Sequence, residues 1–194
     1  ATYALTNGEV DWAGSFIPDI DQVYVNKDPQ NHHYWFPSTG VSIFLYPNHK
    51  NKYLKEIEFR KALSHAIDRD QIVNIAMNNY TVPSDITALS ETMNHWKSNI
   101  SEFEDWTKYD IQLAKEKLLK LGYQEDEESN LLVDKHGENI PFEIIVVSGW
   151  SDWLRAAQII SRNLLELGID ANVRTYDFGA WFDRLRTGQF DLAI

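Results

Sequence analysis

The chain has 194 residues, which suits one domain or one large lobe, and a hydrophobic content of 43% can supply a core. Its 29 Asp and Glu residues outnumber 18 Lys and Arg residues, and the net charge of −11 argues against a nucleic-acid partner, because phosphate binding needs a cationic surface. The chain has no cysteine, which excludes disulfides and thiolate chemistry, and no apolar run of about 18 residues that could span a membrane.

The first fifty residues contain short apolar segments separated by turn residues. They predict the end of a helix over 1–5, a short strand over 9–16, a helical turn over 20–24 and a strand over 34–47. The last strand is the strongest of these predictions, because branched aliphatic residues recur at every second position from 41 to 45.

Residues 59–80 predict two helices in tandem. The apolar residues that share one face of the first helix are Phe59, Leu63, Ala66 and Ile67. Asp68 can cap the second helix, because Gln71 follows three residues later as in a capping box. The residues that the second helix is expected to bury are Ile72, Ile75 and Ala76.

The middle of the chain is less regular. Residues 81–106 are polar with little periodicity, and we expect them to wrap around the surface. Asp110 then caps a helix that stops at Gly122, and residues 131–140 predict a hairpin built on a turn at 134–137.

The last third of the chain alternates strands and helices. The order is strand 142–147, helix 152–168, strand 169–173, helix 179–186 and strand 190–194. This order predicts parallel pairing with right-handed crossovers, and therefore an α/β fold with a mixed sheet flanked by helices. Because the chain ends in an apolar strand, we expect it to be incomplete and the natural protein to continue past Ile194.

The sequence FRKALSHAIDRDQIV, residues 59–73, resembles a segment of the family 5 extracellular solute-binding proteins. The matching positions are Phe59, Arg60, Ala62, Leu63, Ala66, Ile67, Asp68, Arg69, Ile72 and Val73. Weaker resemblances are carried by NGEVDWAG, YDIQLAKEKLLKLGY, LLELGIDANV and GQFDLAI, so the similarity extends over most of the chain.

The resemblance implies a lobe of a type II periplasmic-binding-protein-like receptor. Residues 1–50 would be connecting strands from a first lobe into a second, and residues 51–194 would be that second lobe, truncated at its C-terminal end. Such receptors capture a small-molecule ligand by closing two lobes and pass it to an ABC permease. The resemblance thus implies a monomeric, extracytoplasmic protein, periplasmic or lipid-anchored at the cell surface, without a cofactor.

The candidate ligand-binding residues are aromatic and hydroxyl side chains at predicted strand ends. They are Trp12, Trp35, Ser38, Thr39, Ser148, Trp150 and Trp153. Trp150 has the clearest rationale, since it lies after strand 142–147 and before a helix, where open parallel sheets bind ligands. Core packing is the alternative for every Trp, and Trp153 also fits the apolar face of its helix. Asp152 is a further candidate that could instead be the cap of that helix.

The segments DWAGSFIP and YWFP resemble a Trp-rich subset of the family that binds β-linked oligosaccharides. An oligosaccharide that stacks on exposed rings is therefore the ligand we favour, and an oligopeptide is the alternative within the family. Two readings from other classes are a carbohydrate-active hydrolase, which would need two facing carboxylates, and a pure interaction module.

Neither a metal site nor an enzyme is expected. The six His residues are scattered without His-Glu-x-x-His spacing, and neither a Gly-x-Ser-x-Gly elbow nor a phosphate-binding loop occurs.

Overall fold

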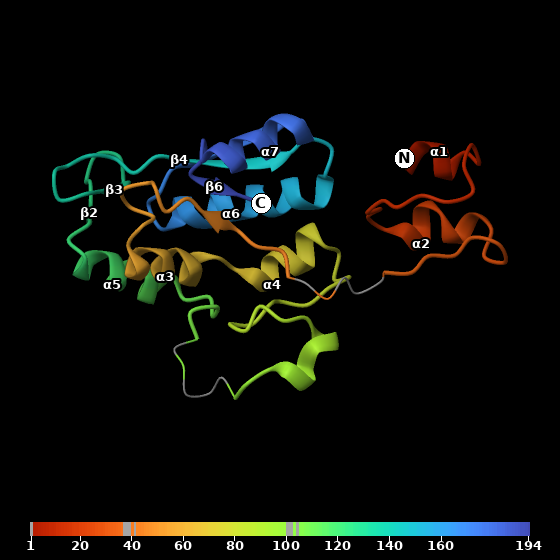
Figure 1. Ribbon diagram of the computed structural model, residues 1–194, viewed down its shortest axis with the longest axis horizontal. Coiled ribbons are helices and arrows are strands. Elements are labelled where there is room, and N and C mark those ends of the chain that lie inside the picture. The colour runs from red at the N-terminus through yellow and green to blue at the C-terminus, as the bar shows by residue number, and fades with distance from the viewer. Residues whose placement is uncertain (1, 37–39, 41, 100–102, 104) are drawn as a thin grey trace.

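The computed structural model of the chain describes residues 2–36, 40, 42–99, 103 and 105–194. Figure 1 shows a small N-terminal unit, residues 2–36, beside a larger body formed by residues 42–194. None of the helices in these ranges is both long enough and apolar enough to cross a bilayer.

The N-terminal unit is helical. It contains α1 (Thr2–Thr6), α2 (Ile20–Val23) and a 3-10 turn over Val25–Lys27. Its small core consists of Leu5, Ile17, Ile20 and Tyr24. The helix end is confirmed over residues 2–5, with residue 1 outside the described part of the chain, and the turn over 20–24 is confirmed, but residues 9–16 form no strand. Their alternation has no neighbouring strand to pair with, and without a partner the extended segment forms no ladder.

The strand predicted over 34–47 is mostly wrong as well. Only Tyr46–Pro47 pair, as β1, while residues 34–36 and 42–45 have no ladder partner. Residues 37–39 and 41 lie outside the described part of the chain. Branched residues at alternate positions thus indicate an extended backbone here, but pairing is limited to the two residues that reach another strand.

The body is built on a four-stranded mixed sheet with the order β1-β6-β4-β5. The other strands are β4 (Phe142–Val147), β5 (Ala171–Tyr176) and β6 (Leu192–Ala193). Strand β4 pairs in parallel with both β5 and β6, which confirms the predicted β-α-β-α-β arrangement. Strand β1 is antiparallel to β6 at the edge. A separate hairpin joins β2 (Gln124–Glu125) to β3 (Leu132–Val133).

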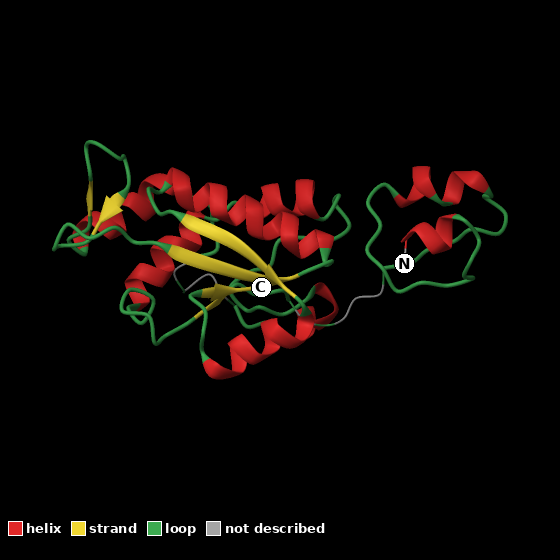
Figure 2. Cartoon of the chain, turned by 90° about the horizontal axis from the view of Figure 1, so that it is seen from above, coloured by secondary structure: helices red, strands yellow, loops and turns green. Residues whose placement is uncertain are grey.

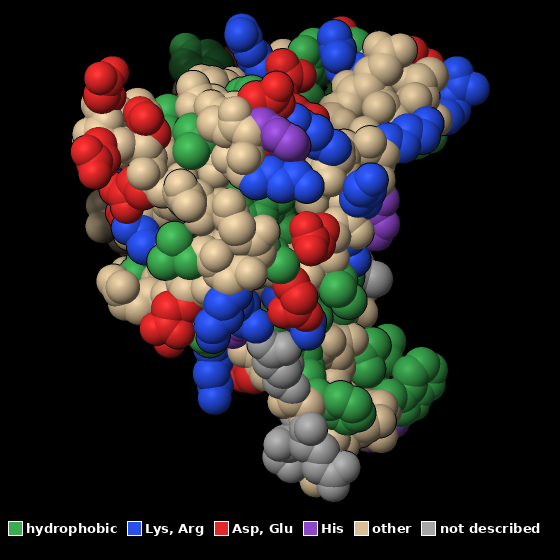
Figure 3. Space-filling view, turned by 90° about the vertical axis from the view of Figure 1, so that its left-hand side faces the viewer, with side chains coloured by type: hydrophobic (Ala, Val, Ile, Leu, Met, Phe, Trp, Pro, Cys, Tyr) green, Lys and Arg blue, Asp and Glu red, His purple; other side chains and the backbone are tan. Residues whose placement is uncertain are grey.

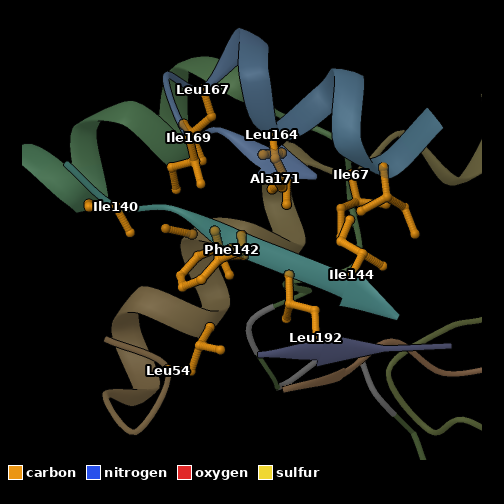
Figure 4. Close-up of a cluster of buried hydrophobic side chains, with 14 of the residues drawn as sticks. Leu54, Ile67, Ile140, Phe142, Ile144, Leu164, Leu167, Ile169, Ala171 and Leu192 are labelled. Carbon is orange, nitrogen blue, oxygen red and sulfur yellow. The ribbon is translucent and has the colours of Figure 1, made fainter. Parts of the chain in front are cut away.

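Helices cover both faces of this sheet (Figure 2). On one face, α6 (Ser151–Glu166) packs together with α3 (Ile57–Ala66) and α5 (Ile111–Lys120) over the side chains of Ile144 and Val146. On the other face, α7 (Phe178–Thr187) covers Ile145 and Val147. Figure 4 shows the first layer, in which Phe142, Ile144 and Leu192 of the strands meet Leu164 and Leu167. Strand β4 is therefore buried on both faces from Ile144 to Val147.

The tandem helices are present and differ from the prediction in one respect. The four apolar residues assigned to the first helix, from Phe59 to Ile67, are buried. The carboxylate of Asp68 accepts a hydrogen bond from the Gln71 backbone N–H at 2.9 Å and caps α4 (Arg69–Gln71). A π-helical turn, Ile72–Ala76, follows and shifts the register, so Ala76 is buried, Ile72 is half-buried and Ile75 is 50% exposed.

Of two further Asp residues considered as helix N-caps, one caps its helix and the other does not. Asp110 caps α5 as predicted, because its carboxylate accepts from the Leu113 backbone N–H at 2.9 Å. Asp152 does not cap α6; the N-cap residue is Trp150, which makes no side-chain capping bond, and Asp152 lies in the first turn. Within 81–106, the described residues include a 3-10 helix over Glu91–Trp96.

Candidate functional site: an aromatic shelf at the ends of two parallel strands

Two parallel strands end side by side and deliver their following residues to one edge of the sheet. The register pairs Val147 of β4 with Tyr176 of β5, and the Ser148 backbone N–H donates to the Tyr176 carbonyl at 2.7 Å. After Ser148, the positive φ of Gly149 (87°) turns the chain into Trp150 and α6.

The second strand ends in a similar way. After Tyr176 the carboxylate of Asp177 accepts from the Ala180 backbone N–H at 3.0 Å and so caps α7 at its first residue, Phe178. The rings of Phe178 and Trp150 consequently lie 6.0 Å apart between centroids, although 28 positions separate them in the sequence.

The rings at this edge form a continuous cluster, which we name the aromatic shelf. Its members are Trp150, Trp153, Phe178, Trp181 and Phe182. Trp150 meets Trp153 edge-on at 4.5 Å, and Phe178 stacks on Phe182 at 6.0 Å with an interplanar angle of 12°. Edge-on and stacked pairs at these distances are the favoured geometries of aromatic rings.

The shelf has a buried base and an exposed surface. Trp181 is only 9% exposed and packs against Ile145 and Val147 beneath it. Phe178 and Phe182 are 55% and 53% exposed, and Trp150 is partly exposed. Large apolar rings held open to solvent in this way are typical of a binding surface.

The charged side chains of β4 and β5 near the shelf interact with neighbouring groups of the sheet and of α7. The Tyr176 hydroxyl donates to Glu143 at 3.2 Å, and Arg174 lies 3.8 Å from the same carboxylate. Arg184 stacks over the Tyr176 ring at 4.3 Å. The rings of the shelf present flat apolar faces, and the chemistry that these rings support is stacking; Asp152 in the first turn of α6 and Asp183 on α7 are the acidic residues beside them in the sequence.

The sequence-predicted site residues are only partly brought together. Trp150 and Trp153 are in contact, and Ser148 is exposed at the end of β4. Trp12 and Trp35 are on the N-terminal unit and are 74% and 69% exposed. The ring of Trp12 lies over Gly14, where a Cβ would be 3.4 Å from it. Ser38 and Thr39 fall outside the described residues.

Sequence reasoning missed Phe178 and Phe182. The predicted strand ended at residue 173 and the predicted helix began at 179, so Phe178 fell in the gap between them. The rule that selected Trp150 would also have selected Phe178, because each is the first large side chain after the end of a parallel strand.

The shelf faces the side of the body on which the N-terminal unit lies. Strand β4 points toward that side in two perpendicular views (Figures 1 and 2), and Trp150 follows the end of this strand. Among the described residues, no group of three or more His, Asp or Glu side chains is placed to hold a metal ion.

Comparison with known proteins agrees with this architecture. The model of the family "Bacterial extracellular solute-binding proteins, family 5 Middle" matches residues 1–194. A probable peptide ABC transporter periplasmic-binding protein of Sinorhizobium fredii is 24% identical over 184 residues, which is 93% of this chain and 31% of that protein. The oligopeptide-binding protein AppA of Bacillus subtilis is 22% identical over 153 residues, 77% of this chain and 27% of that protein.

Solved structures give the same result. A periplasmic oligopeptide-binding protein of Thermotoga maritima with bound mannohexaose matches with a TM-score of 0.87 and 26% identity, covering 98% of this chain and 36% of that one. The structure of Bacillus subtilis AppA in complex with a nonapeptide has the same fold, with a TM-score of 0.74 at 17% identity, over 99% of this chain and 37% of that one. The chain thus spans little more than a third of these proteins. It belongs to the family 5 bacterial extracellular solute-binding proteins.

Proposed function

We propose that this chain is the ligand-capturing part of the binding component of an ABC importer, and that its ligand is a β-linked oligosaccharide. The observation that carries the proposal is the aromatic shelf, in which exposed rings of Trp150, Phe178 and Phe182 lie on a buried Trp181 base. Pyranose rings have an apolar C–H face that stacks on such rings, and a neutral sugar needs no charged partner.

The relatives support both this ligand and its alternative. The Thermotoga maritima neighbour holds mannohexaose, which favours the sugar. Its name and those of the Sinorhizobium fredii and Bacillus subtilis proteins refer to peptides, so an oligopeptide is the second candidate. A peptide would be expected to add a strand to an exposed sheet edge, and β5 forms such an edge.

Capture by a hinged receptor involves more than one surface. Because the chain covers 36% of the Thermotoga maritima protein, we propose that the shelf forms one wall and that other parts of a complete receptor close over the ligand. In this proposal residues 51–194 belong to a second lobe and residues 1–50 connect it to a first. The receptor would act as a monomer outside the cytoplasm and deliver the ligand to a membrane permease.

Calorimetry on the complete protein tests the ligand class. Mannohexaose and cellohexaose are expected to bind, and Trp150→Ala is expected to weaken binding about tenfold through loss of one stacking ring. Tyr3→Ala is the matched control, because Tyr3 is an exposed ring on the N-terminal unit. Binding of peptides without binding of either sugar would show that the ligand class is wrong.

A second measurement distinguishes binding of the sugar from its hydrolysis. The family consists of solute-binding proteins, and we propose that this member also binds without converting its ligand. Prolonged incubation with mannohexaose should leave the number of reducing ends constant. A steady rise that scales with protein concentration would favour the hydrolase instead.

A further inference from the structure

Described residues between 86 and 106 line a hollow that is separate from the aromatic shelf. Its volume is about 430 Å³, and its lining includes Thr87, Leu89, Trp96, Ser98, Phe103 and Trp106. We name it the loop pocket. Figure 3 shows hydrophobic side chains at the surface of the lower projection that this segment forms, with Trp96 and Phe103 among the exposed rings of the molecule.

One wall of the loop pocket is fixed by Asp85. Its carboxylate accepts from the Lys97 ammonium at 2.8 Å, and from the backbone N–H and hydroxyl of Thr87 at 2.9 and 2.5 Å. Lys97 first and Thr87 second lower the pKa of Asp85. Since Lys97 directly follows the 3-10 helix Glu91–Trp96, this ion pair joins the two ends of the wall that carries Trp96.

The other wall is tied to the tandem helices. The carboxylate of Asp105 accepts from the backbone N–H and hydroxyl of Thr107, at 3.2 and 2.5 Å. Arg69 donates to the Thr107 carbonyl at 2.9 Å and to the Ser64 carbonyl at 3.0 Å. Trp106 lies in the sequence between Asp105 and Thr107, whose positions these bonds fix. Pre-organised walls lower the ordering cost of binding.

The lining combines flat apolar faces with donors that the protein itself does not use. The indole N–H groups of Trp96 and Trp106 and the Ser98 hydroxyl make no hydrogen bond within the described chain. Among the described lining residues none is charged, and Asp85 and Lys97 in the wall neutralise each other. The flat faces and unused donors of these described residues match a neutral polyhydroxylated ring.

We propose that the loop pocket is a second carbohydrate site, which takes one pyranose unit of a neutral oligosaccharide. The site deepens the proposed function and rests on it, because it assumes that this protein binds sugars. One ring would stack on Trp96 or Trp106, with its hydroxyl groups accepting from the indole N–H groups and exchanging hydrogen bonds with Ser98.

Nuclear magnetic resonance of the indole N–H groups can test the two sites at once. The seven Trp residues give one indole signal each, and single Trp→Phe variants assign them. Titration with mannohexaose to about 10 mM would approach saturation of a millimolar site. We expect the Trp96 and Trp106 signals to move as the sugar is added, together with those of Trp150 and Trp153.

Two pocket variants are compared with one shelf variant. Trp96→Ala should weaken binding about tenfold as read from the Trp106 signal and leave the titration of Trp150 unchanged. Ser98→Ala removes only the hydroxyl and keeps the wall, so it should weaken binding at Trp106 by about threefold, as expected for one neutral hydrogen bond. Trp150→Ala should affect the shelf signals alone.

The outcomes separate this proposal from the proposed function. If the indole signals of Trp150 and Trp153 shift on addition of mannohexaose while those of Trp96 and Trp106 do not, the loop-pocket proposal is wrong and the proposed sugar function stands. Movement of the shelf signals with a nonapeptide but not with mannohexaose would overturn the sugar function and with it the pocket. If no indole signal moves at 10 mM mannohexaose, about saturation for a millimolar site, the loop pocket is likewise refuted.

Discussion

At the scale of single residues, Trp181 connects the core to the shelf. Its ring centroid lies 6.3 Å from that of Trp150 and 5.9 Å from that of Phe178, while its other neighbours are the sheet residues Ile145 and Val147. Its indole N–H is buried and has no hydrogen-bond partner among the described residues. An unsatisfied buried donor costs about 1–3 kcal/mol, so Trp181 stabilises the fold through the packing of its ring and not through its N–H.

Truncation of this ring should be costly. Trp181→Ala is expected to lower the free energy of unfolding by about 3–5 kcal/mol through loss of buried surface and creation of a cavity. Phe178→Ala, on the same helix but exposed, should cost less than about 1 kcal/mol. Urea unfolding followed by circular dichroism gives both values. Equal costs for the two variants would show that Trp181 does not form the base of the shelf.

Asp134 is the residue with the clearest pH dependence. Its carboxylate accepts hydrogen bonds from the backbone N–H groups of His136 (2.9 Å) and Glu138 (3.1 Å), the Tyr53 hydroxyl (3.0 Å) and the Lys52 ammonium (3.4 Å). Burial works to raise the pKa of Asp134, but these donors outweigh it and lower the pKa to about 2. A carboxyl group with a lowered pKa in the folded state stabilises the fold above its unfolded value of 3.8.

The stabilisation by Asp134 should therefore disappear in acid. Asp134→Asn is expected to lower the urea midpoint at pH 7, and the difference from the parent should shrink as the pH falls from about 4 toward 2, because the unfolded state takes up its proton near 3.8 and the folded state only near 2. Glu138→Gln is the control, because its ion pair with Lys52 is exposed and should matter little. A difference that stays constant down to pH 2 would contradict this assignment.

At the scale of elements, the sequence predicted what local signals determine. The caps at Asp68 and Asp110, the apolar face from Phe59 to Ile67 and the parallel strands all follow from short-range patterns. The strands over 9–16 and 34–47 failed because alternation does not reveal whether a pairing partner exists. The exposed Ile75 was missed because a π-turn breaks the 3.6-residue repeat on which its prediction depended.

The glycines that end α5 and α6 offer a matched test of element packing. Gly122 and Gly168 have φ values of 92° and 93°, so an Ala at either position meets the same backbone strain. A Cβ at Gly122 would have nothing within 4 Å, whereas one at Gly168 would lie 3.0 Å from the backbone nitrogen of Leu132. That nitrogen also donates to the Gly168 carbonyl at 2.7 Å, which ties the β2–β3 hairpin to the end of α6.

Gly168→Ala should consequently cost more than Gly122→Ala. We expect about 1 kcal/mol for Gly122→Ala from strain alone, and a further 1–3 kcal/mol, roughly the cost of overpacking, for Gly168→Ala. Hydrogen exchange should also show faster exchange of the Leu132 amide in the second variant. If both variants unfold at the same urea concentration, the hairpin moves away without cost and the contact contributes no stability.

At the scale of the whole molecule, the predicted site is divided between two parts of the chain. Trp150 was selected by its position after a strand end, which the sequence reveals, and the structure adds its contact with Trp153. The relation of Trp12 and Trp35 to that pair depends on how the N-terminal unit sits on the body, and no local pattern encodes this. The contacts that hold the unit in place centre on Tyr80, which lies 4.5 Å from the Phe36 ring and 5.9 Å from the Phe16 ring.

Tyr80→Ala should therefore loosen the N-terminal unit without unfolding the body. The unit has a small core, and the Asn78 side-chain amide donates to Asp19 at 3.3 Å, which also joins the unit to the tandem helices. So small a core is not expected to stay folded alone. Amides of Ile20–Tyr24 should exchange faster in Tyr80→Ala, those of β4 should not change, and Tyr80→Phe should behave like the parent.

Because Trp12 and Trp35 are on the loosened unit, sugar affinity should fall in Tyr80→Ala if these rings share the ligand with the shelf. Unchanged affinity alongside faster exchange would restrict the binding surface to the body.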